Sequence, residues 1–106
     1  MHFVERLKNK VQRENLWFFI LLLLASGDKY GYELRGLIRS RFGFWSGNVT
    51  AYRVLYDLQD ARLVKAEMKD RRRYYGITGA GRNEIDSAKD FLENLVVEAS
   101  KSVSRS

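Results

Sequence analysis

Apolar residues recur at helical spacing along most of the chain, and their pattern changes from segment to segment. Near the N-terminus, Phe3, Leu7 and Val11 stand among charged residues, which indicates an amphipathic helical segment over residues 1–15. This segment either continues into the next one as a single long helix or breaks near Asn15. The pattern alone does not distinguish these alternatives.

The segment over residues 16–25 is apolar at almost every position. It is too short to span a bilayer, which needs about 20 residues. It also resembles the apolar part of a signal peptide, but two glutamates interrupt the basic stretch before it. We therefore expect a helix buried on nearly every side. Its remaining face, which includes Trp17 or Phe18, needs a second surface to cover it, most simply a partner subunit.

The next amphipathic helix opens at Tyr30-Gly31-Tyr32-Glu33-Leu34, after a polar turn. Its apolar face is expected to hold Leu34, Leu37, Ile38 and Phe42. Gly43 suits the C-terminus of such a helix. The following Phe44 and Trp45 are expected to be core residues in a short connection; a binding role for either is the less favoured alternative.

A helix is then predicted over residues 48–62, with two contrasting faces. Ala51, Leu55 and Leu58 lie at helical spacing with Arg62, and this stripe should face a core. The small polar residues before it suit a helix N-cap. The opposite face carries Asn48, Thr50, Arg53, Tyr56 and Asp57. A helix of this kind fits a DNA major groove, although most helices with polar outer faces are merely solvated.

After residue 63 the period changes to alternation, which is typical of strands. Val64, Ala66 and Met68 alternate with charged residues, Asp70-Arg71-Arg72 suits a tight turn, and residues 73–77 form a second strand. The predicted hairpin, residues 64–77, is strongly basic at its tip, with Lys69, Arg71, Arg72, Arg73 and Tyr74. Charge runs are usually solvated loops, but beside a candidate recognition helix phosphate contact is the favoured interpretation.

The last helix is predicted over residues 79–99, with Thr78 as its cap. Its apolar stripe has coiled-coil-like spacing and includes Ile85, Ala88, Phe91, Leu92, Leu95, Val96 and Ala99. A domain of 106 residues buries a modest core, so a second subunit is the expected cover for this stripe. Residues 100–106 are short and polar, and we expect them to be a disordered tail.

The composition of the chain limits the classes of function that it can have. The net charge is +6 and the pI about 9.8, which favours an anionic partner such as nucleic acid. The chain has no cysteine and a single histidine, His2, so no metal site and no cofactor are expected. The sequence shows no Ser/His/Asp or Cys/His set and no glycine-rich phosphate loop, so no motif in it indicates an enzyme.

Three helices followed by a hairpin form a winged helix-turn-helix, so the expected fold class is mainly α with a small β-hairpin and dimerisation helices at both ends. Over roughly residues 16–95 the chain also resembles the PadR-like transcriptional regulators. The motifs that carry the resemblance are Gly31-Tyr32-Glu33-Leu34, Thr50-Ala51-Tyr52, Leu63-Val64, Arg72-Arg73-Tyr74-Tyr75 and Thr78-Gly79-Ala80-Gly81-Arg82. The chain departs from the family at Arg53, where proline is usual, and at Arg62, where glycine is usual.

The resemblance implies a homodimeric, cytoplasmic repressor of the compact subfamily, without membrane association, bound to an inverted-repeat operator in double-stranded DNA. Residues 16–78 would be the DNA-binding domain, with helix 48–62 in the major groove and wing 64–77 on the backbone or minor groove. The expected DNA-binding residues are Asn48, Thr50, Tyr52, Arg53, Tyr56, Lys69, Arg71, Arg72, Arg73 and Tyr74. The expected dimer-interface residues are Trp17, Phe18, Ile85, Ala88, Phe91, Leu92, Leu95 and Val96.

Three questions stay open at the level of sequence. Some relatives release DNA when a small hydrophobic or aromatic effector binds near the dimer interface, and Trp17 and Phe18 either serve such an effector or pack the interface. A sequence-independent architectural DNA-binding protein has the same charge and fold. A winged-helix protein-interaction module is the third alternative, although three consecutive arginines speak against it.

Overall fold

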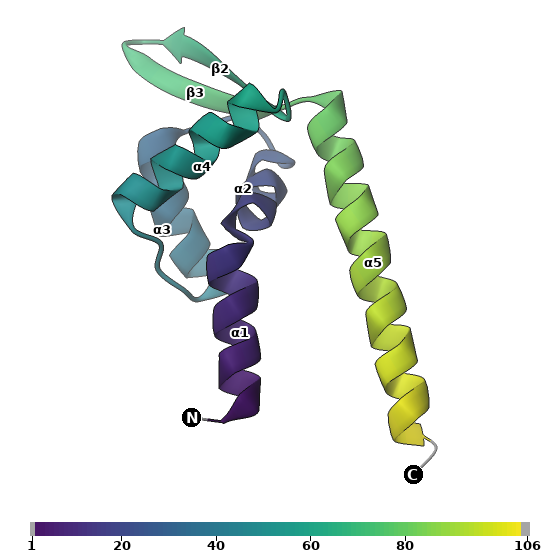
Figure 1. Ribbon diagram of the computed structural model, residues 1–106. Coiled ribbons are helices and arrows are strands. Elements are labelled where there is room, and N and C mark those ends of the chain that lie inside the picture. Colours follow the sequence, from purple (N-terminus) through teal and green to yellow (C-terminus); the bar gives the residue numbers. More distant parts are fainter. Residues whose placement is uncertain (1, 105–106) are drawn as a thin grey trace.

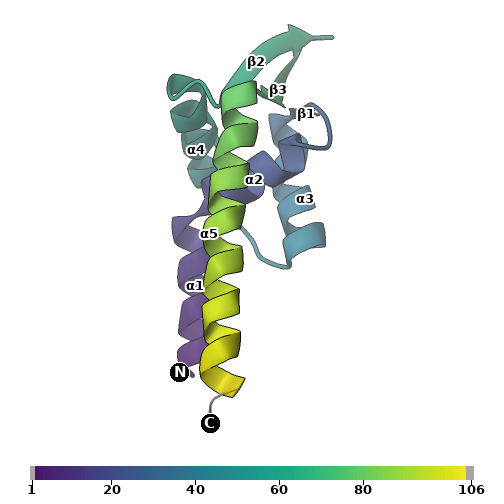
Figure 2. The same cartoon turned by 90° about the vertical axis from the view of Figure 1, so that its right-hand side faces the viewer.

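A computed structural model describes residues 2–104, which form five helices and a three-stranded antiparallel sheet (Figures 1 and 2). The elements in chain order are α1 (Phe3–Glu14), α2 (Leu16–Leu24), β1 (Lys29–Tyr30), α3 (Gly31–Phe42), α4 (Asn48–Asp60), β2 (Val64–Lys69), β3 (Arg72–Ile77) and α5 (Gly79–Ser104). The predicted fold class, a mainly α winged helix-turn-helix with helices at both ends, is confirmed.

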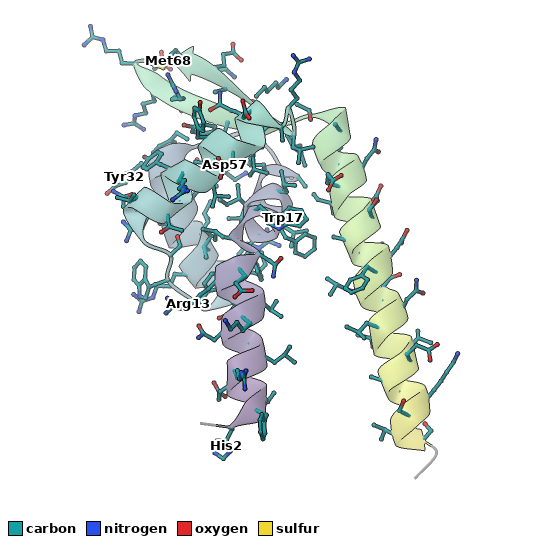
Figure 3. The ribbon with its side chains drawn as sticks, in the orientation of Figure 1. His2, Arg13, Trp17, Tyr32, Asp57 and Met68 are labelled. Atoms are coloured by element: carbon teal, nitrogen blue, oxygen red, sulfur yellow. The ribbon has the colours of Figure 1, made fainter. Side chains whose placement is uncertain are left out.

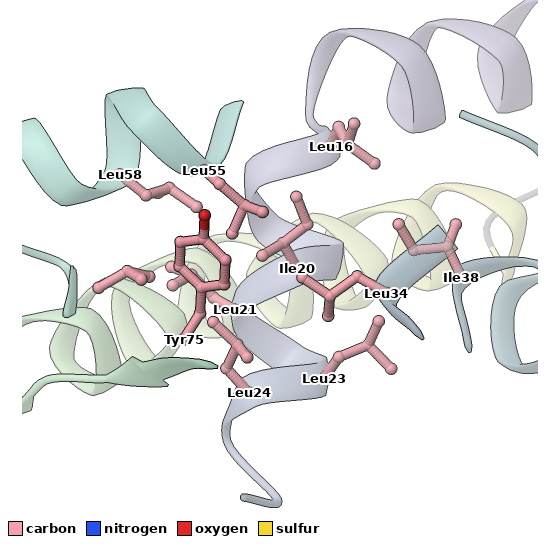
Figure 4. Packing of buried hydrophobic residues seen from close by; sticks show 11 residues of the cluster. Leu16, Ile20, Leu21, Leu23, Leu24, Leu34, Ile38, Leu55, Leu58 and Tyr75 are labelled. Atoms are coloured by element: carbon pink, nitrogen blue, oxygen red, sulfur yellow. The ribbon is translucent and has the colours of Figure 1, made fainter. Parts of the chain in front are cut away.

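Helix α2 lies at the centre of the hydrophobic core. Its residues Leu16, Ile20, Leu21, Leu23 and Leu24 are all buried. They pack against buried side chains of α3, α4 and β3, among them Leu34, Ile38, Leu55, Leu58 and Tyr75 (Figure 4). This burial confirms the expected buried helix, since a helix with almost no polar face must be surrounded on most sides. Within residues 2–104, no helix is long and apolar enough to cross a membrane.

The chain breaks between α1 and α2 at Asn15. This residue has a non-helical backbone, with φ −128° and ψ 34°. Its carbonyl oxygen accepts a hydrogen bond from the amide of Phe18 at 3.0 Å, which begins the next helix. Of the two alternatives left open by the sequence, the structure adopts the broken helix.

Helix α4 ends at Asp60, two residues earlier than predicted. Arg62 lies outside the helix in a left-handed conformation, with φ 63°. The amide of Leu63 donates to the carbonyl of Leu58, and that of Arg62 to the carbonyl of Gln59, both at 2.9 Å. This pairing is a Schellman motif, which usually places glycine at the left-handed position. The expectation that Arg62 continues the apolar stripe was therefore wrong.

The sheet has the strand order β1-β3-β2. Lys69 pairs with Arg72 at the end of the hairpin, so the turn consists of Asp70 and Arg71 alone. Both turn residues have positive φ, 50° and 66°, as a two-residue type I′ turn requires. Arg72 accordingly starts β3 instead of belonging to the turn. The two-residue strand β1 was not predicted, because two residues are too few to show alternation.

Helix α5 begins as predicted and ends later. The Thr78 hydroxyl accepts a hydrogen bond from the amide of Gly81 at 3.0 Å, which confirms Thr78 as the cap. The helix continues to Ser104, so the disordered tail expected from residue 100 is wrong for residues 100–104. The Ser102 hydroxyl donates to the Glu98 carbonyl, and Lys101 forms an ion pair with Glu98 at 3.3 Å, which both support these last turns. Residues 105 and 106 lie outside the described part.

The connection between α3 and α4 contains two aromatic residues with different environments. Phe44 packs edge-on against Phe19 with ring centroids 5.0 Å apart, as expected for a core residue. Trp45 is 55% exposed, so the expectation of a second core residue was wrong. Its ring instead packs against the guanidinium of Arg39, which lies on the surface of α3.

The molecule is elongated because α1 and α5 extend from the body in the same general direction (Figures 1 and 2). The radius of gyration is 15.7 Å, against about 13 Å for a compact domain of this length. Helix α1 has no buried residue, and the only buried residue of α5 is Gly81. Both helices therefore contribute little to the core of the single chain.

Candidate nucleic-acid interface

The outer face of α4 is set by the burial of its inner face. Ala51, Leu55 and Leu58 are buried against the core, so the residues between them turn outward. The exposed side chains include the five predicted on this helix, Asn48, Thr50, Tyr52, Arg53 and Tyr56. Arg53 forms no side-chain hydrogen bond or ion pair within residues 2–104. Its donors are therefore available to an external acceptor.

Val49 also lies on this outer face and is 83% exposed. It was not among the predicted site residues. The signal was its spacing, since Val49 falls outside the stripe of Ala51, Leu55 and Leu58. An exposed pair of methyl groups of this kind is suited to contact with the methyl group of a thymine.

The hairpin presents its cations in different directions. Arg71 lies in the turn, whereas Arg72 and Arg73 are successive strand residues and leave opposite faces of β3. The Arg72 guanidinium lies 4.9 Å over the ring of Tyr30. Lys69 lies over the ring of Tyr74, with its ammonium nitrogen 5.7 Å from the ring centroid.

Tyr74 differs from the other predicted hairpin residues because it is half-buried. Its ring packs edge-on against Tyr30, with centroids 5.8 Å apart. Tyr30 in turn stacks parallel to Tyr32 at 6.1 Å. Tyr74 thus supports the aromatic group beneath the hairpin cations, while Lys69 and the arginines are the exposed groups.

A cavity of about 640 Å³ connects the hairpin with α4. Its walls include Tyr30, Tyr32, Tyr52, Arg72 and Arg73. A Cβ atom on the intervening Gly31 would lie 2.8 Å from Cε1 of Tyr52, so glycine allows α3 and α4 to approach here.

Tyr32 is 81% exposed and points away from the side of the molecule that carries α5 (Figure 3). Neither Tyr30 nor Tyr32 was among the predicted site residues. The sequence feature that could have indicated them is the pair of tyrosines on either side of Gly31 at the start of the helix.

Charge is distributed unevenly between the two sides of the molecule. The four ion pairs found within residues 2–104 all lie in α1 and α5. Arg53, Arg71, Arg72 and Arg73 therefore have no carboxylate partner in the described part of the chain. The surface formed by α4 and the hairpin has a positive net charge, because its six cations, Arg53, Lys65, Lys69, Arg71, Arg72 and Arg73, outnumber its four carboxylates, Asp57, Asp60, Glu67 and Asp70.

The predicted dimer-interface residues divide into two groups. Trp17 and Ile85 are partly buried against the protomer's own core, and Figure 3 shows Trp17 on the side of α2 that faces α5. A groove of about 520 Å³ brings Phe18 of α2 together with Leu92 and Val96 of α5. Of the predicted interface residues of α5, Phe91, Leu92, Leu95 and Val96 are exposed in the single chain, while Ala88 is partly buried.

The sequence model of the transcriptional regulator PadR-like family matches residues 20–87. The chain belongs to this family. The match begins within the core helix α2 and ends in the first turns of α5, so it covers α3, α4 and the hairpin in full. No curated protein matches the chain.

Solved structures agree with the family assignment. A transcriptional regulator from Clostridium thermocellum is 28% identical, with a TM-score of 0.76 over 87% of this chain and 93% of that one. A PadR family regulator from Eggerthella lenta has a TM-score of 0.79 over 95% of this chain and 92% of that one; at 21% identity it shows the fold alone. Bacillus subtilis PadR, solved in complex with operator DNA, is 26% identical, with a TM-score of 0.60 over 68% of this chain and 45% of that one.

Proposed function

We propose that this PadR-like protein is a homodimeric repressor that binds an inverted-repeat operator in the cytoplasm and has no catalytic activity. The observation that carries the proposal is the separation of two exposed surfaces. One lies on α4 and the hairpin and has a positive net charge and many hydrogen-bonding groups; the other lies on α1 and α5 and has large exposed apolar side chains. The first suits DNA and the second suits a copy of the same chain. The complex of Bacillus subtilis PadR with operator DNA supports the DNA-binding part.

On the DNA side, α4 occupies the major groove and the hairpin contacts the backbone or minor groove. Asn48, Thr50, Tyr52, Arg53 and Tyr56 meet the groove, because they are the exposed polar side chains of α4. Lys69, Arg71, Arg72 and Arg73 bind phosphates, with Tyr74 beneath them. Phosphate contacts supply affinity and position, whereas contacts with base edges supply specificity.

On the other side, α5 pairs with its counterpart and α1 covers part of the seam. Phe3 is 85% exposed and Leu7 62% exposed in the single chain, as are Phe91 at 67% and Leu95 at 55% in α5. An isolated helix of 26 residues with one buried residue gains little from tertiary packing, so a second subunit is the natural source of that packing. The groove beside Phe18 is the place for α1 of the second copy and, in its absence, for a small hydrophobic or aromatic effector.

Selection of bound sequences from a random DNA pool tests this proposal. The expected product is an inverted repeat, with half-site centres about 10 base pairs apart or a multiple of that spacing. Salt-dependent binding without any preferred sequence would favour an architectural DNA-binding protein instead. Failure to bind DNA at any salt concentration would favour a protein-interaction module.

A further inference from the structure

A second cationic group lies outside the predicted site, on α3 and the connection that follows it. The guanidinium carbon of Arg39 lies 4.2 Å from the ring centroid of Trp45, and that of Arg35 lies 5.8 Å from the same ring. Arg35 also donates from Nε to the carbonyl oxygen of Ser46 at 3.0 Å, which ties the connection to α3. Trp45 is thus held on the surface with an arginine on its face.

This group is not neutralised by the rest of the described chain. Neither arginine has an ion-pair partner within residues 2–104. Arg39 is exposed, and its side chain donates no hydrogen bond within the same residues. Trp45 is 55% exposed although a tryptophan usually buries most of its large surface. An exposed tryptophan that supports an unpaired guanidinium is suited to present that cation to a partner.

The group continues the surface of the proposed recognition helix. A depression of about 490 Å³ is lined by Trp45 and Arg35 on one side and by Asn48 and Tyr52 of α4 on the other. The connection between α3 and α4 lies on the opposite side of α4 from the hairpin (Figures 1 and 2). The α4 surface therefore has basic residues on both flanks, the hairpin on one and Arg39 on the other.

We propose that Arg39, stacked on Trp45, binds a phosphate of the DNA backbone on the flank of α4 opposite the hairpin. This inference rests on the proposed DNA binding and adds a contact to it. Stacking fixes the plane of the guanidinium and leaves its N–H edge free, and that edge matches the geometry of phosphate oxygens. Trp45 acts as a positioning residue, since it holds Arg39 without needing to touch the DNA. The two phosphate contacts, one from each flank, orient α4 in the groove.

The salt dependence of operator binding tests the proposal. Arg39→Ala is expected to lower the slope of log K against log salt by about one unit per protomer, or about two per dimer, for operator and random duplex alike. Arg41→Ala is the matched control. Arg41 lies two positions along the same helix, hence on a different side, and its guanidinium lies 5.3 Å from the ring of Phe42. We expect this control to keep the slope of the parent protein.

Trp45 provides two further readouts. Trp45→Ala should weaken binding in the same direction as Arg39→Ala but less, and Trp45→Phe should restore it, because a ring face is again present under the guanidinium. In a Trp17→Phe background, Trp45 is the remaining tryptophan, and its emission should change when the operator is added. Thermal unfolding of each variant, followed by circular dichroism, separates loss of binding from loss of folding.

The outcomes separate this inference from the proposed function. If the parent binds its operator and Arg39→Ala keeps both the affinity and the slope, the contact is absent and the group serves another partner. An equal loss in Arg39→Ala and Arg41→Ala would also overturn it, because net charge would then explain the effect. Absence of DNA binding by the parent protein would overturn the proposed function first.

Discussion

Two surfaces of this molecule leave side chains exposed for different physical reasons. On α4 and the hairpin most of the exposed groups are polar or charged, and water can solvate them, although Val49 and Met68 are exposed as well. On α1 and α5 many exposed groups are large and apolar, such as Phe3 and Phe91, and their contact with water is unfavourable. Large exposed apolar patches are typical of interaction sites, and for this reason we propose that a second copy of the chain covers this surface. Substitutions on the two surfaces should therefore affect different measurements.

The largest effect is expected on the apolar surface. Leu92→Glu combined with Leu95→Glu places charges on the exposed stripe of α5 and should give monomers or insoluble protein, as measured by light scattering. Ser87→Glu with Asn94→Glu adds the same charge at polar positions of the same helix and should leave assembly intact. A dimer in the leucine double variant would rule out this interface.

On the cationic surface, replacing Arg71, Arg72 and Arg73 by alanine should weaken binding to every DNA sequence while leaving assembly unchanged. Because Arg72 and Arg73 leave opposite faces of β3, at most two of the three contact phosphates in each subunit. The slope of log K against log salt should fall by about one unit for each lost contact. A slope equal to that of the parent protein would show that the hairpin lies away from the backbone.

A smaller and more selective effect is expected from Arg53→Ala. If Arg53 reads a guanine edge, the change should cost about 1–3 kcal/mol at the selected operator and relax the preference at one position per half-site. If it binds phosphate, the loss should be uniform across sequences. Competition titrations with operator and random duplex distinguish these roles. Binding of the operator as tight as that of the parent would exclude both.

The smallest effect is expected at a position that belongs to neither surface. Arg62→Gly should raise the free energy of unfolding by about 0.5–1 kcal/mol, because relief of the left-handed backbone outweighs the added freedom of glycine in the unfolded chain. Urea denaturation measures this change. Arg62→Ala is the control and should bring no gain, since it keeps the Cβ atom. Glycine without any gain would show that Arg62 is unstrained.

The sequence was most informative where one pattern governs a whole element. The apolar run of α2 and the stripe of Ala51, Leu55 and Leu58 depend on burial alone, so their positions in the core were predicted correctly. Features that depend on a tertiary contact were not predicted. Strand β1 is defined by its pairing with Tyr74 and Tyr75, and Trp45 lies on the surface in contact with two arginines of α3. Arg62 continues the helical spacing, but the helix ends before it.

The candidate site shows the same limit. Periodicity identified the exposed polar residues of α4, and their outward position follows from the buried stripe. It did not identify Tyr30 and Tyr32, because their importance lies in stacking beneath Arg72. A pattern along one element cannot reveal which side chains of three elements meet. Their assignment to DNA contact, like that of the α5 stripe to dimerisation, stays a prediction for the experiments above.

The junction at Thr78 joins α5 rigidly to the winged helix, so a small rotation of α5 moves the winged helix with it. The Thr78 hydroxyl donates to the Arg62 carbonyl at 2.8 Å and accepts from the Gly81 amide, and a Cβ on Gly81 would clash with the backbone oxygen of Leu63. The start of α5 is thus locked to the end of α4. Helix α5 has 26 residues, so at about 1.5 Å per residue it is about 39 Å long. In the proposed dimer, if the paired helices cross near their C-terminal ends, a change of about 5° in the angle between them would change the separation of the two winged helices by about 3.4 Å, the rise of one base pair. The distance between the two half-sites that the dimer can bind would therefore depend on the crossing angle of the two α5 helices.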